Sequence, residues 1–152
     1  MFPLAQPLGC GDRAPQIALS DQNGIERRSD QLAGKALVLF FYPKDDTPIC
    51  TAEACAFRDA HEEFIAAGAE VVGVSGDSAA SHAAFARKHG LPYSIVSDAD
   101  GALRRLYGVP RTLGFLPGRV TYVIDREGIV RLVFNSAFSS SGHVRRALDA
   151  VR

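Results

Sequence analysis

The stretch FYPKDDTPICTAEACAFRD, residues 41–59, joins an apolar run to an amphipathic pattern. The residues ALVLFFY at 36–42 form a continuous apolar segment, which predicts a strand buried on both faces. Thr47-Pro48 is a helix-start signal, because threonine can cap free N–H groups and proline fits the first helical position. We therefore predict a helix from about Thr47 to Ala67, with Thr47 as its cap.

Two cysteines lie on this predicted helix. Cys50 falls in the first turn, where unpaired N–H groups and the helix dipole favour a thiolate over a thiol. Cys55 follows five residues later, and on an ideal helix the two Cα atoms lie about 8–9 Å apart. A disulfide needs Cα atoms within about 7 Å. The two cysteines therefore either never bond or bond only when the helix unwinds locally.

Composition points to an ordinary globular chain. The 152 residues are 47% hydrophobic and 22% charged, and they predict a single domain, 1–152. A formal net charge of zero gives no reason to expect a nucleic-acid or membrane partner. No apolar run has the length of a membrane span, and the N-terminal residues do not resemble a secretory signal. We expect a soluble, cytoplasmic protein. The three cysteines are too few for a disulfide scaffold.

The remaining patterns alternate between strand and helix. Residues 16–19 and 25–27 flank a hairpin turn at 21–24. Further along the chain we predict a short helical turn at 29–34, strands at 69–75 and 93–97, helices at 78–89 and 100–107, a loop at 109–118, a second hairpin at 120–124 and 129–134, and a helix from about residue 140. This order predicts an α/β layer fold with a mixed central sheet flanked by helices and an N-terminal β-hairpin.

The run Pro43-x-x-x-Thr47-x-x-Cys50 resembles the active-site signature of the peroxiredoxins, which are thiol peroxidases on a thioredoxin-like fold. Cys55 is similar to the resolving cysteine of the peroxiredoxin Q subfamily, also called bacterioferritin comigratory protein. Ile49 departs from that pattern, because a glycine is common there. This departure affects the shape and polarity of the pocket rim.

Two other segments carry the same resemblance. GDRAP at residues 11–15 resembles the opening of the family, and LPGRVTYVID at 116–125 resembles a later segment in which an arginine, here Arg119, completes the site. The resemblance covers nearly the whole chain in the right order. Cys10 corresponds to no family position, and we interpret it as a bystander thiol, with a mixed disulfide as the alternative.

The resemblance implies a thiol-dependent peroxidase acting on hydrogen peroxide and organic hydroperoxides. Cys50 would attack the peroxide and become a sulfenic acid, which Cys55 would resolve as an intramolecular disulfide. Thioredoxin, or alternatively glutaredoxin, would reduce that disulfide. The protein is expected to be a monomer with no cofactor and no metal.

The other site residues each have a structural interpretation beside the one the resemblance implies. Thr47 could be only a cap, or its hydroxyl could also bond a peroxide oxygen. Pro43 could end the strand, or its ring could shield the pocket from water. Arg119 would by default be a solvated residue at a strand edge, whereas the family match implies that it stabilises the Cys50 thiolate. Arg58 and Lys44 are predicted to be surface charges.

Three alternatives remain open. A thioredoxin-type thiol–disulfide oxidoreductase would prefer Cys-x-x-Cys, but four residues intervene here. A redox-sensing binding module could use the same disulfide to change a surface. A zinc site formed by Cys50, Cys55 and His61 matches no common zinc spacing.

Overall fold

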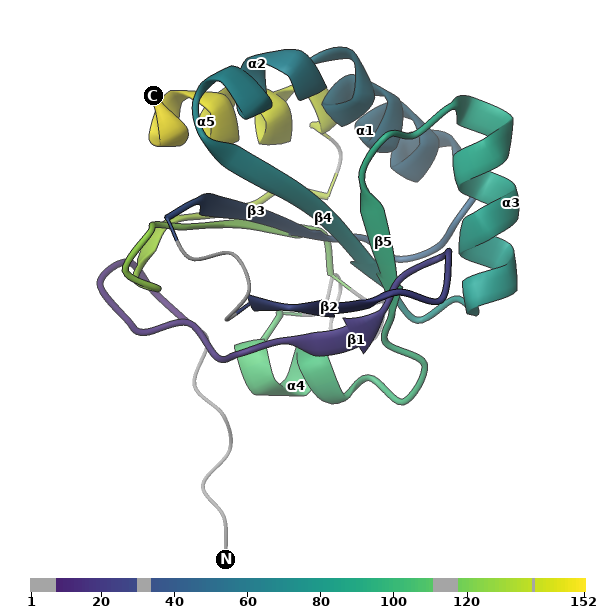
Figure 1. The fold of residues 1–152 in the computed structure, drawn as a ribbon, viewed down its shortest axis with the longest axis horizontal. Helices are drawn as coiled ribbons and strands as arrows, with labels where there is room; N and C mark the ends of the chain where they lie inside the picture. Colours follow the sequence, from purple (N-terminus) through teal and green to yellow (C-terminus); the bar gives the residue numbers. More distant parts are fainter. Residues whose placement is uncertain (1–7, 30–33, 111–117, 138) are drawn as a thin grey trace, which may run out of the picture.

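The computed structural model describes residues 8–29, 34–110, 118–137 and 139–152. A five-stranded sheet in the order β5-β4-β3-β6-β7 forms the centre (Figure 1). Its central strand pairs in parallel with β4 and antiparallel with β6, so the prediction of a mixed sheet is confirmed. The strands are β3 (Ala36–Phe41), β4 (Ala69–Ser75), β5 (Ser94–Ser97), β6 (Val120–Ile124) and β7 (Val130–Asn135). The N-terminal hairpin is also confirmed, as β1 (Ala18–Ser20) paired with β2 (Glu26–Arg28).

The sheet is covered on both faces (Figure 1). One face packs against α1 (Pro48–Asp59), α2 (His61–Ala66), α3 (Ala79–His89) and α5 (Ser140–Val151). The other face packs against α4 (Ala102–Tyr107) and the β1–β2 hairpin. Two apolar clusters result, one on each side of the sheet.

Strand β3 connects the two clusters, as its unbroken apolar sequence predicts. Val38 and Phe40 face the helix layer of α1, while Leu39 and Phe41 face the layer of α4. On the neighbouring strand, Gly73 lies opposite Phe40, and a Cβ there would come within 2.9 Å of the Phe40 ring. The glycine therefore allows the aromatic ring to lie flat against the sheet.

The helix after β3 differs from the prediction. The predicted single helix to Ala67 is wrong, because the chain turns at Ala60 and α1 and α2 are separate helices. No glycine or proline marks this turn, so no local pattern in the sequence predicts it. The turn still keeps Phe57 and Phe64 fully buried, with ring centroids 5.8 Å apart.

Other boundaries agree closely with the sequence patterns. Ser78 accepts a hydrogen bond from the Ser81 amide at the start of α3, and Gly90 ends that helix with a φ of 60°. Most of the helical turn predicted at 29–34 and of the loop predicted at 109–118 lies outside the described residues. Among the described helices, none has both the length and the apolar character needed to cross a membrane.

The packing of Phe57 gives a stability prediction. Its ring stacks on Phe40, with centroids 4.4 Å apart and planes inclined by 15°. Phe57→Ala should lower the free energy of unfolding by about 3–5 kcal/mol, because it leaves a cavity between α1 and β3. Urea denaturation measures this change. Ile65→Ala is the control, since Ile65 is 58% exposed and its loss should change stability little. A loss below about 1 kcal/mol for Phe57→Ala would contradict this packing analysis.

Candidate active site

Cys50 lies in the first turn of α1, the helix that follows β3. It is the third residue of the helix and is 1% exposed. The first intrahelical bond here runs from the Thr51 amide to the Thr47 carbonyl, at 2.8 Å, so the Cys50 amide precedes the bonded part of the helix. The sulfur is thus held in the first turn of a helix, where partial positive charge favours an anion.

Arg119 contacts Cys50 although it lies 69 positions further along the sequence. It immediately precedes β6, whose first residue, Val120, pairs with Phe41 at the end of β3. This register brings Arg119 Nη2 to 3.2 Å from Cys50 Sγ. The side chain is 6% exposed, so the default interpretation of a solvated strand-edge arginine is wrong. Arg119 Nε also donates to the Ala137 carbonyl at 3.0 Å, which fixes the guanidinium plane.

Thr47 occupies the N-cap position, but its side chain makes no capping hydrogen bond, so the predicted cap is wrong. Its hydroxyl instead donates to the Lys44 carbonyl at 3.0 Å. That bond uses the hydroxyl hydrogen and leaves the oxygen lone pairs free to accept. Pro43 is half-buried in the same turn, between the end of β3 and the start of α1.

Cys55 lies on the same uninterrupted helix as Cys50 and is half-buried, and both are free thiols. Two hydrogen bonds hold this part of α1 to its surroundings. The Tyr93 hydroxyl donates to the Ala54 carbonyl at 2.6 Å, and Arg58 Nη1 donates to the His89 carbonyl at 2.7 Å. Because Cys55 is five positions after Cys50 on an intact helix, the two Cα atoms lie about 8–9 Å apart, and a disulfide between them requires α1 to open.

Two buried residues beside this site have no role in the sequence analysis. Glu53 is 0% exposed, and its Oε1 accepts from Arg119 Nη1 at 2.9 Å. His143, from α5, is also 0% exposed, and its Nδ1 lies 3.4 Å from Glu53 Oε2. Glu53 could have been suspected, since it lies one helical turn after Cys50 on the same face. His143 is 93 residues away from Cys50, and only the packing of α5 on α1 brings it near.

Arg104, on α4, is a third residue that the sequence analysis missed. It donates to the Tyr42 carbonyl at 2.7 Å and to the Gly118 carbonyl at 3.0 Å. It therefore joins the end of β3 to the segment that leads into Arg119. Burial lowers the pKa of Arg104, while the negative charges of Asp98 and Cys50 oppose that shift.

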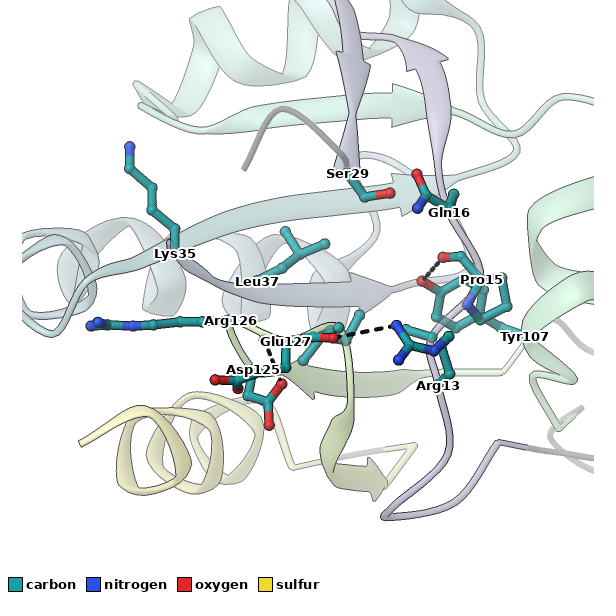
Figure 2. Close-up of a pocket in the computed structure, with 13 residues that line it drawn as sticks. Arg13, Pro15, Gln16, Ser29, Lys35, Leu37, Tyr107, Asp125, Arg126 and Glu127 are labelled. Carbon is teal, nitrogen blue, oxygen red and sulfur yellow. Dashed lines mark hydrogen bonds between the residues drawn. The ribbon is translucent and has the colours of Figure 1, made fainter. Parts of the chain in front are cut away.

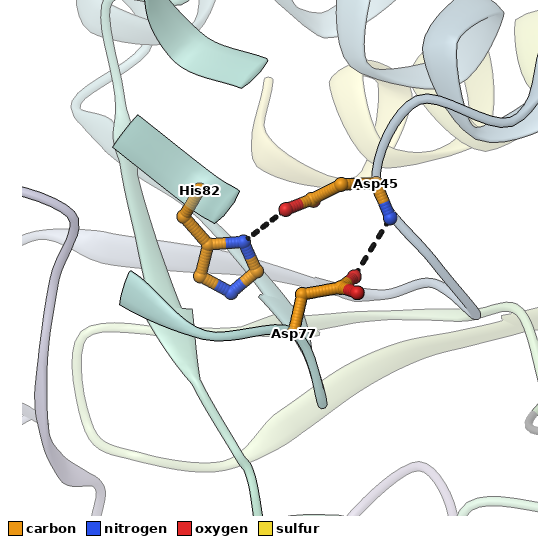
Figure 3. Close-up of side chains that lie close together, drawn as sticks. All are labelled: Asp45, Asp77 and His82. Carbon is orange, nitrogen blue, oxygen red and sulfur yellow. Dashed lines mark hydrogen bonds and ion pairs between the residues drawn. The ribbon is translucent and has the colours of Figure 1, made fainter. Parts of the chain in front are cut away.

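The loop before α1 is also more buried than its charge suggests. Asp45 is only 6% exposed and accepts from Tyr42, Ser81 and His82 at 2.5–2.8 Å. Its amide donates to Asp77 Oδ2 at 2.7 Å (Figure 3). Burial alone would raise the pKa of Asp45, but the hydrogen bonds from His82 and Tyr42 outweigh it and lower the pKa. These bonds fasten the loop to β4 and α3.

Asp45, Asp77 and His82 are also the one group in the described part of the chain whose side chains could together hold a metal ion. Their candidate ligand atoms lie within 4.8 Å of one another. Protein donors already bond both oxygens of Asp45, and Asp77 Oδ2 accepts from the Asp45 amide and from the Ser75 hydroxyl, each at 2.7 Å. The arrangement works as a hydrogen-bonded clasp. Cys50, Cys55 and His61 form no such group.

Figure 2 shows the residues around a separate cavity of about 260 Å³, and no cysteine is among the residues that line it. Its wall includes Leu37 at the start of β3 and Ile124 at the end of β6, whereas Cys50 follows the opposite end of β3. Its lining mixes the basic residues Arg13, Lys35 and Arg126 with the acidic residues Asp125 and Glu127. None of the predicted site residues lines this cavity. Cys10 is exposed elsewhere, with its sulfur 3.5 Å from the Arg131 carbonyl.

A buried thiol at a helix start, contacted by a buried arginine and followed by a second thiol on the same helix, defines a thiol-based redox site. The model of the AhpC/TSA family matches residues 10–133, and the chain belongs to that family. The family predicted from the sequence motifs is therefore confirmed.

Individual relatives agree with this assignment. A chloroplastic peroxiredoxin Q of Gentiana triflora is 49% identical over 139 residues, which cover 91% of this chain and 64% of the relative. One from Sedum lineare is 49% identical over 143 residues, covering 93% of this chain and 77% of the relative. The chain thus spans about two thirds of the length of several curated relatives.

Solved structures give the same fold. BcpB, a peroxidoxin from Mycobacterium tuberculosis, superposes with a TM-score of 0.86 at 40% identity, covering 94% of this chain and 96% of the other. The bacterioferritin comigratory protein of Xanthomonas campestris, studied for alkyl peroxide reduction, gives 0.80 at 34% identity, covering 90% and 92%. The predicted thioredoxin-like fold is confirmed.

The expected cytoplasmic location is contradicted by these relatives, since the plant proteins that match are named chloroplastic. The prediction used net charge, cysteine count and the N-terminal composition. Those properties describe how a domain folds and stays in solution, and they do not specify a compartment.

The clasp around Asp45 predicts a pH-dependent stability difference. Asp45→Asn should lower the free energy of unfolding at pH 7 by about 1.5–3 kcal/mol, because hydrogen bonds to a buried charge are lost. The pKa of Asp45 is lowered by folding, so the wild-type advantage is complete above the unfolded value of about 3.9 and shrinks as the pH falls below it. Urea denaturation between pH 3 and 7 measures the difference.

Asp149→Asn is the control, because Asp149 is exposed on α5 and its carboxylate forms no hydrogen bond or ion pair with the described residues. It should change stability little across the same range. An Asp45→Asn penalty that does not vary with pH would show that the charge of Asp45 is not what stabilises the loop.

Proposed function

We propose that this chain is a thiol-dependent peroxidase that reduces hydrogen peroxide and organic hydroperoxides. The observation that carries the proposal is the 3.2 Å contact between Arg119 Nη2 and Cys50 Sγ in the first turn of α1. The nucleophile in peroxide reduction is a thiolate, and both the helix start and the guanidinium stabilise that form. The names of the relatives support the same activity.

In the proposed first step, the Cys50 thiolate attacks one peroxide oxygen. A sulfur–oxygen bond forms, the oxygen–oxygen bond breaks, and the second oxygen leaves and takes up a proton. Arg119 can donate to an oxygen on which charge develops, because its guanidinium already lies at the sulfur. The Thr47 hydroxyl can accept from the peroxide hydrogen while it donates to the Lys44 carbonyl. We assign Pro43 the role of keeping water from the sulfur.

In the proposed second step, the Cys55 thiol condenses with the Cys50 sulfenic acid, which releases water and forms a disulfide. The helix must open for this step, so the bonds from Tyr93 to Ala54 and from Arg58 to His89 oppose it, together with the backbone hydrogen bonds of α1. We propose thioredoxin as the reductant, with glutaredoxin as the alternative. We further propose that the protein acts as a monomer and that residues 1–152 form one domain.

Treatment with a single equivalent of hydrogen peroxide tests the cycle. After alkylation, peptide masses should show that Cys50 and Cys55 are linked and that Cys10 is alkylated. Cys50→Ser should not react. Cys55→Ser should react once and stop as a sulfenic acid that dimedone traps, because no resolving thiol is present.

Other outcomes separate the alternatives. Three alkylated thiols after peroxide treatment would refute the peroxidase proposal. Reduction of insulin disulfides without peroxide would favour a thioredoxin-type oxidoreductase. Slow peroxide reaction together with a stable oxidised conformer would favour a redox-sensing module.

Arg119→Ala should slow the reaction of Cys50 with peroxide by about 10²–10³-fold, because a donor to the developing negative charge is removed. Stopped-flow measurement of the first step gives the rate. Arg119→Lys should recover only part of it, since one ammonium group cannot reproduce the forked contact with both Cys50 and Glu53. Arg126→Ala, at an exposed arginine, is the control. An unchanged rate in Arg119→Ala would refute the role of Arg119.

A further inference from the structure

The pairing of β3 with β6 stops one residue before Arg119. The last pair in the register joins Phe41 to Val120. Continued further, the same register would place Gly118 opposite Pro43. Proline has no amide hydrogen, so the ladder of hydrogen bonds cannot continue there. On the β3 side, the position of Arg119 therefore depends on contacts other than strand pairing.

Arg104 bridges the two strands at the point where their pairing ends. Its Nη2 donates to the Tyr42 carbonyl at 2.7 Å, and its Nη1 donates to the Gly118 carbonyl at 3.0 Å. Tyr42 immediately precedes Pro43. Gly118 immediately precedes Arg119. One planar guanidinium thus joins the strand that leads into α1 with the segment that carries Arg119.

Helix α4 places this guanidinium. Asp98 is 2% exposed and accepts from the amides of Leu103 and Arg104 at 2.9 and 3.0 Å, which fixes the first turn of the helix. The Arg104 guanidinium lies over the Phe41 ring, 5.7 Å from its centroid. The bridge therefore comes from a helix on the opposite face of the sheet from α1 (Figure 1).

Both residues whose carbonyl groups Arg104 contacts are held by further contacts. The Tyr42 hydroxyl donates to Asp45 Oδ1 at 2.5 Å, so this residue is fixed at its side chain as well as at its carbonyl. Gly118 lies against Pro110, and a Cβ on Gly118 would overlap the Pro110 carbonyl oxygen. A residue without a side chain is thus needed where Arg104 reaches the chain.

The charge of Arg104 and the bridge that it forms are separate contributions. The ionisable groups close to it include Asp98, Cys50 and Tyr122. Burial raises the pKa of Tyr122 to about 12, so that side chain is uncharged near neutral pH. The positive charge of Arg104 acts on Cys50 and Asp98, whereas the bridge acts on the segment that carries Arg119. A lysine at this position would keep the charge and lose the bridge.

We propose that Arg104 is a positioning residue for Arg119, because it replaces the missing strand pairing and so keeps the Arg119 guanidinium at the Cys50 sulfur. The inference rests on the proposed function only in taking Cys50 as the reactive thiol and Arg119 as the residue that stabilises its thiolate. Loss of the bridge should let Arg119 move away from the sulfur and make the thiolate less stable, even where a positive charge remains at position 104.

Ionisation of Cys50 tests the proposal without peroxide. In a Cys10→Ser, Cys55→Ser background, the rate of alkylation by iodoacetamide is followed against pH. Arg104→Lys keeps the positive charge, but one ammonium group cannot reproduce the forked contact with both carbonyls. It should move the midpoint of the pH profile upward by about half to one pH unit, which lowers the rate below the midpoint by roughly three- to tenfold. A change in access to the sulfur would instead alter the plateau at high pH.

Two comparisons decide whether the effect passes through Arg119. In an Arg119→Ala background, Arg104→Lys should change the rate by less than about twofold, since no guanidinium remains to be positioned. Arg105→Lys is the matched control, because Arg105 is the exposed neighbour on α4 and donates to the Asp100 carbonyl. It should leave the profile unchanged. Equal shifts of the midpoint by Arg104→Lys in both backgrounds, or no shift in either, would overturn the proposal.

Arg104→Gln gives a second test if Arg104→Lys does not fold. This variant also removes the charge, so part of its effect should occur in both backgrounds. The additional slowing in the protein that retains Arg119 measures the positioning. Additional slowing of less than about twofold would overturn the proposal. Because no measurement uses peroxide, a protein that lacks peroxidase activity would refute the proposed function and still give a result here.

Discussion

The contact between Arg119 and Cys50 is the interaction on which the rest of the site depends. It exists because β6 pairs with β3 in a register that places Val120 beside Phe41, one residue from the arginine. The guanidinium is then held by Glu53 and by the Ala137 carbonyl. A cation buried this deeply must have partners on every side, since an unpaired one would be too costly to keep. Among the partners of Arg119, the Cys50 sulfur is the group that reacts with peroxide in the proposed mechanism.

The proposed cycle places two conflicting requirements on helix α1. Its first turn must be intact to stabilise an anion at Cys50, yet its middle must open before Cys55 can reach the same sulfur. The hydrogen bonds around α1 are consistent with both requirements. The Asp45 clasp fastens the loop before the helix to β4 and α3, while Tyr93 and Arg58 hold the segment around Cys55 by single hydrogen bonds to carbonyl groups. The loop before Cys50 is thus held by more hydrogen bonds than the segment around Cys55, which opens in the proposed cycle.

The buried acids extend this picture beyond the cysteine. Glu53 first looks like an ion-pair partner that would weaken the effect of Arg119 on the sulfur. Burial opposes the ionisation of Glu53 and raises its pKa to about 7, against the lowering effect of Arg119. His143 packs beside Glu53 in a fixed orientation, because its two ring nitrogens bond the Thr121 hydroxyl and the Ser136 carbonyl. The guanidinium of Arg119 is therefore shared between Glu53 and the Cys50 sulfur.

Local patterns in the sequence determined most of the fold and the family. The unbroken apolar run of β3 fixed a strand buried on both faces, and Ser78 and Gly90 marked both ends of α3. Those features act through neighbours in the chain, so the sequence alone reveals them. Tertiary structure decided the burial of Arg119, Glu53 and His143 beside Cys50. Their burial depends on contacts between segments far apart in the sequence. No local pattern specifies which charged residues will be buried together.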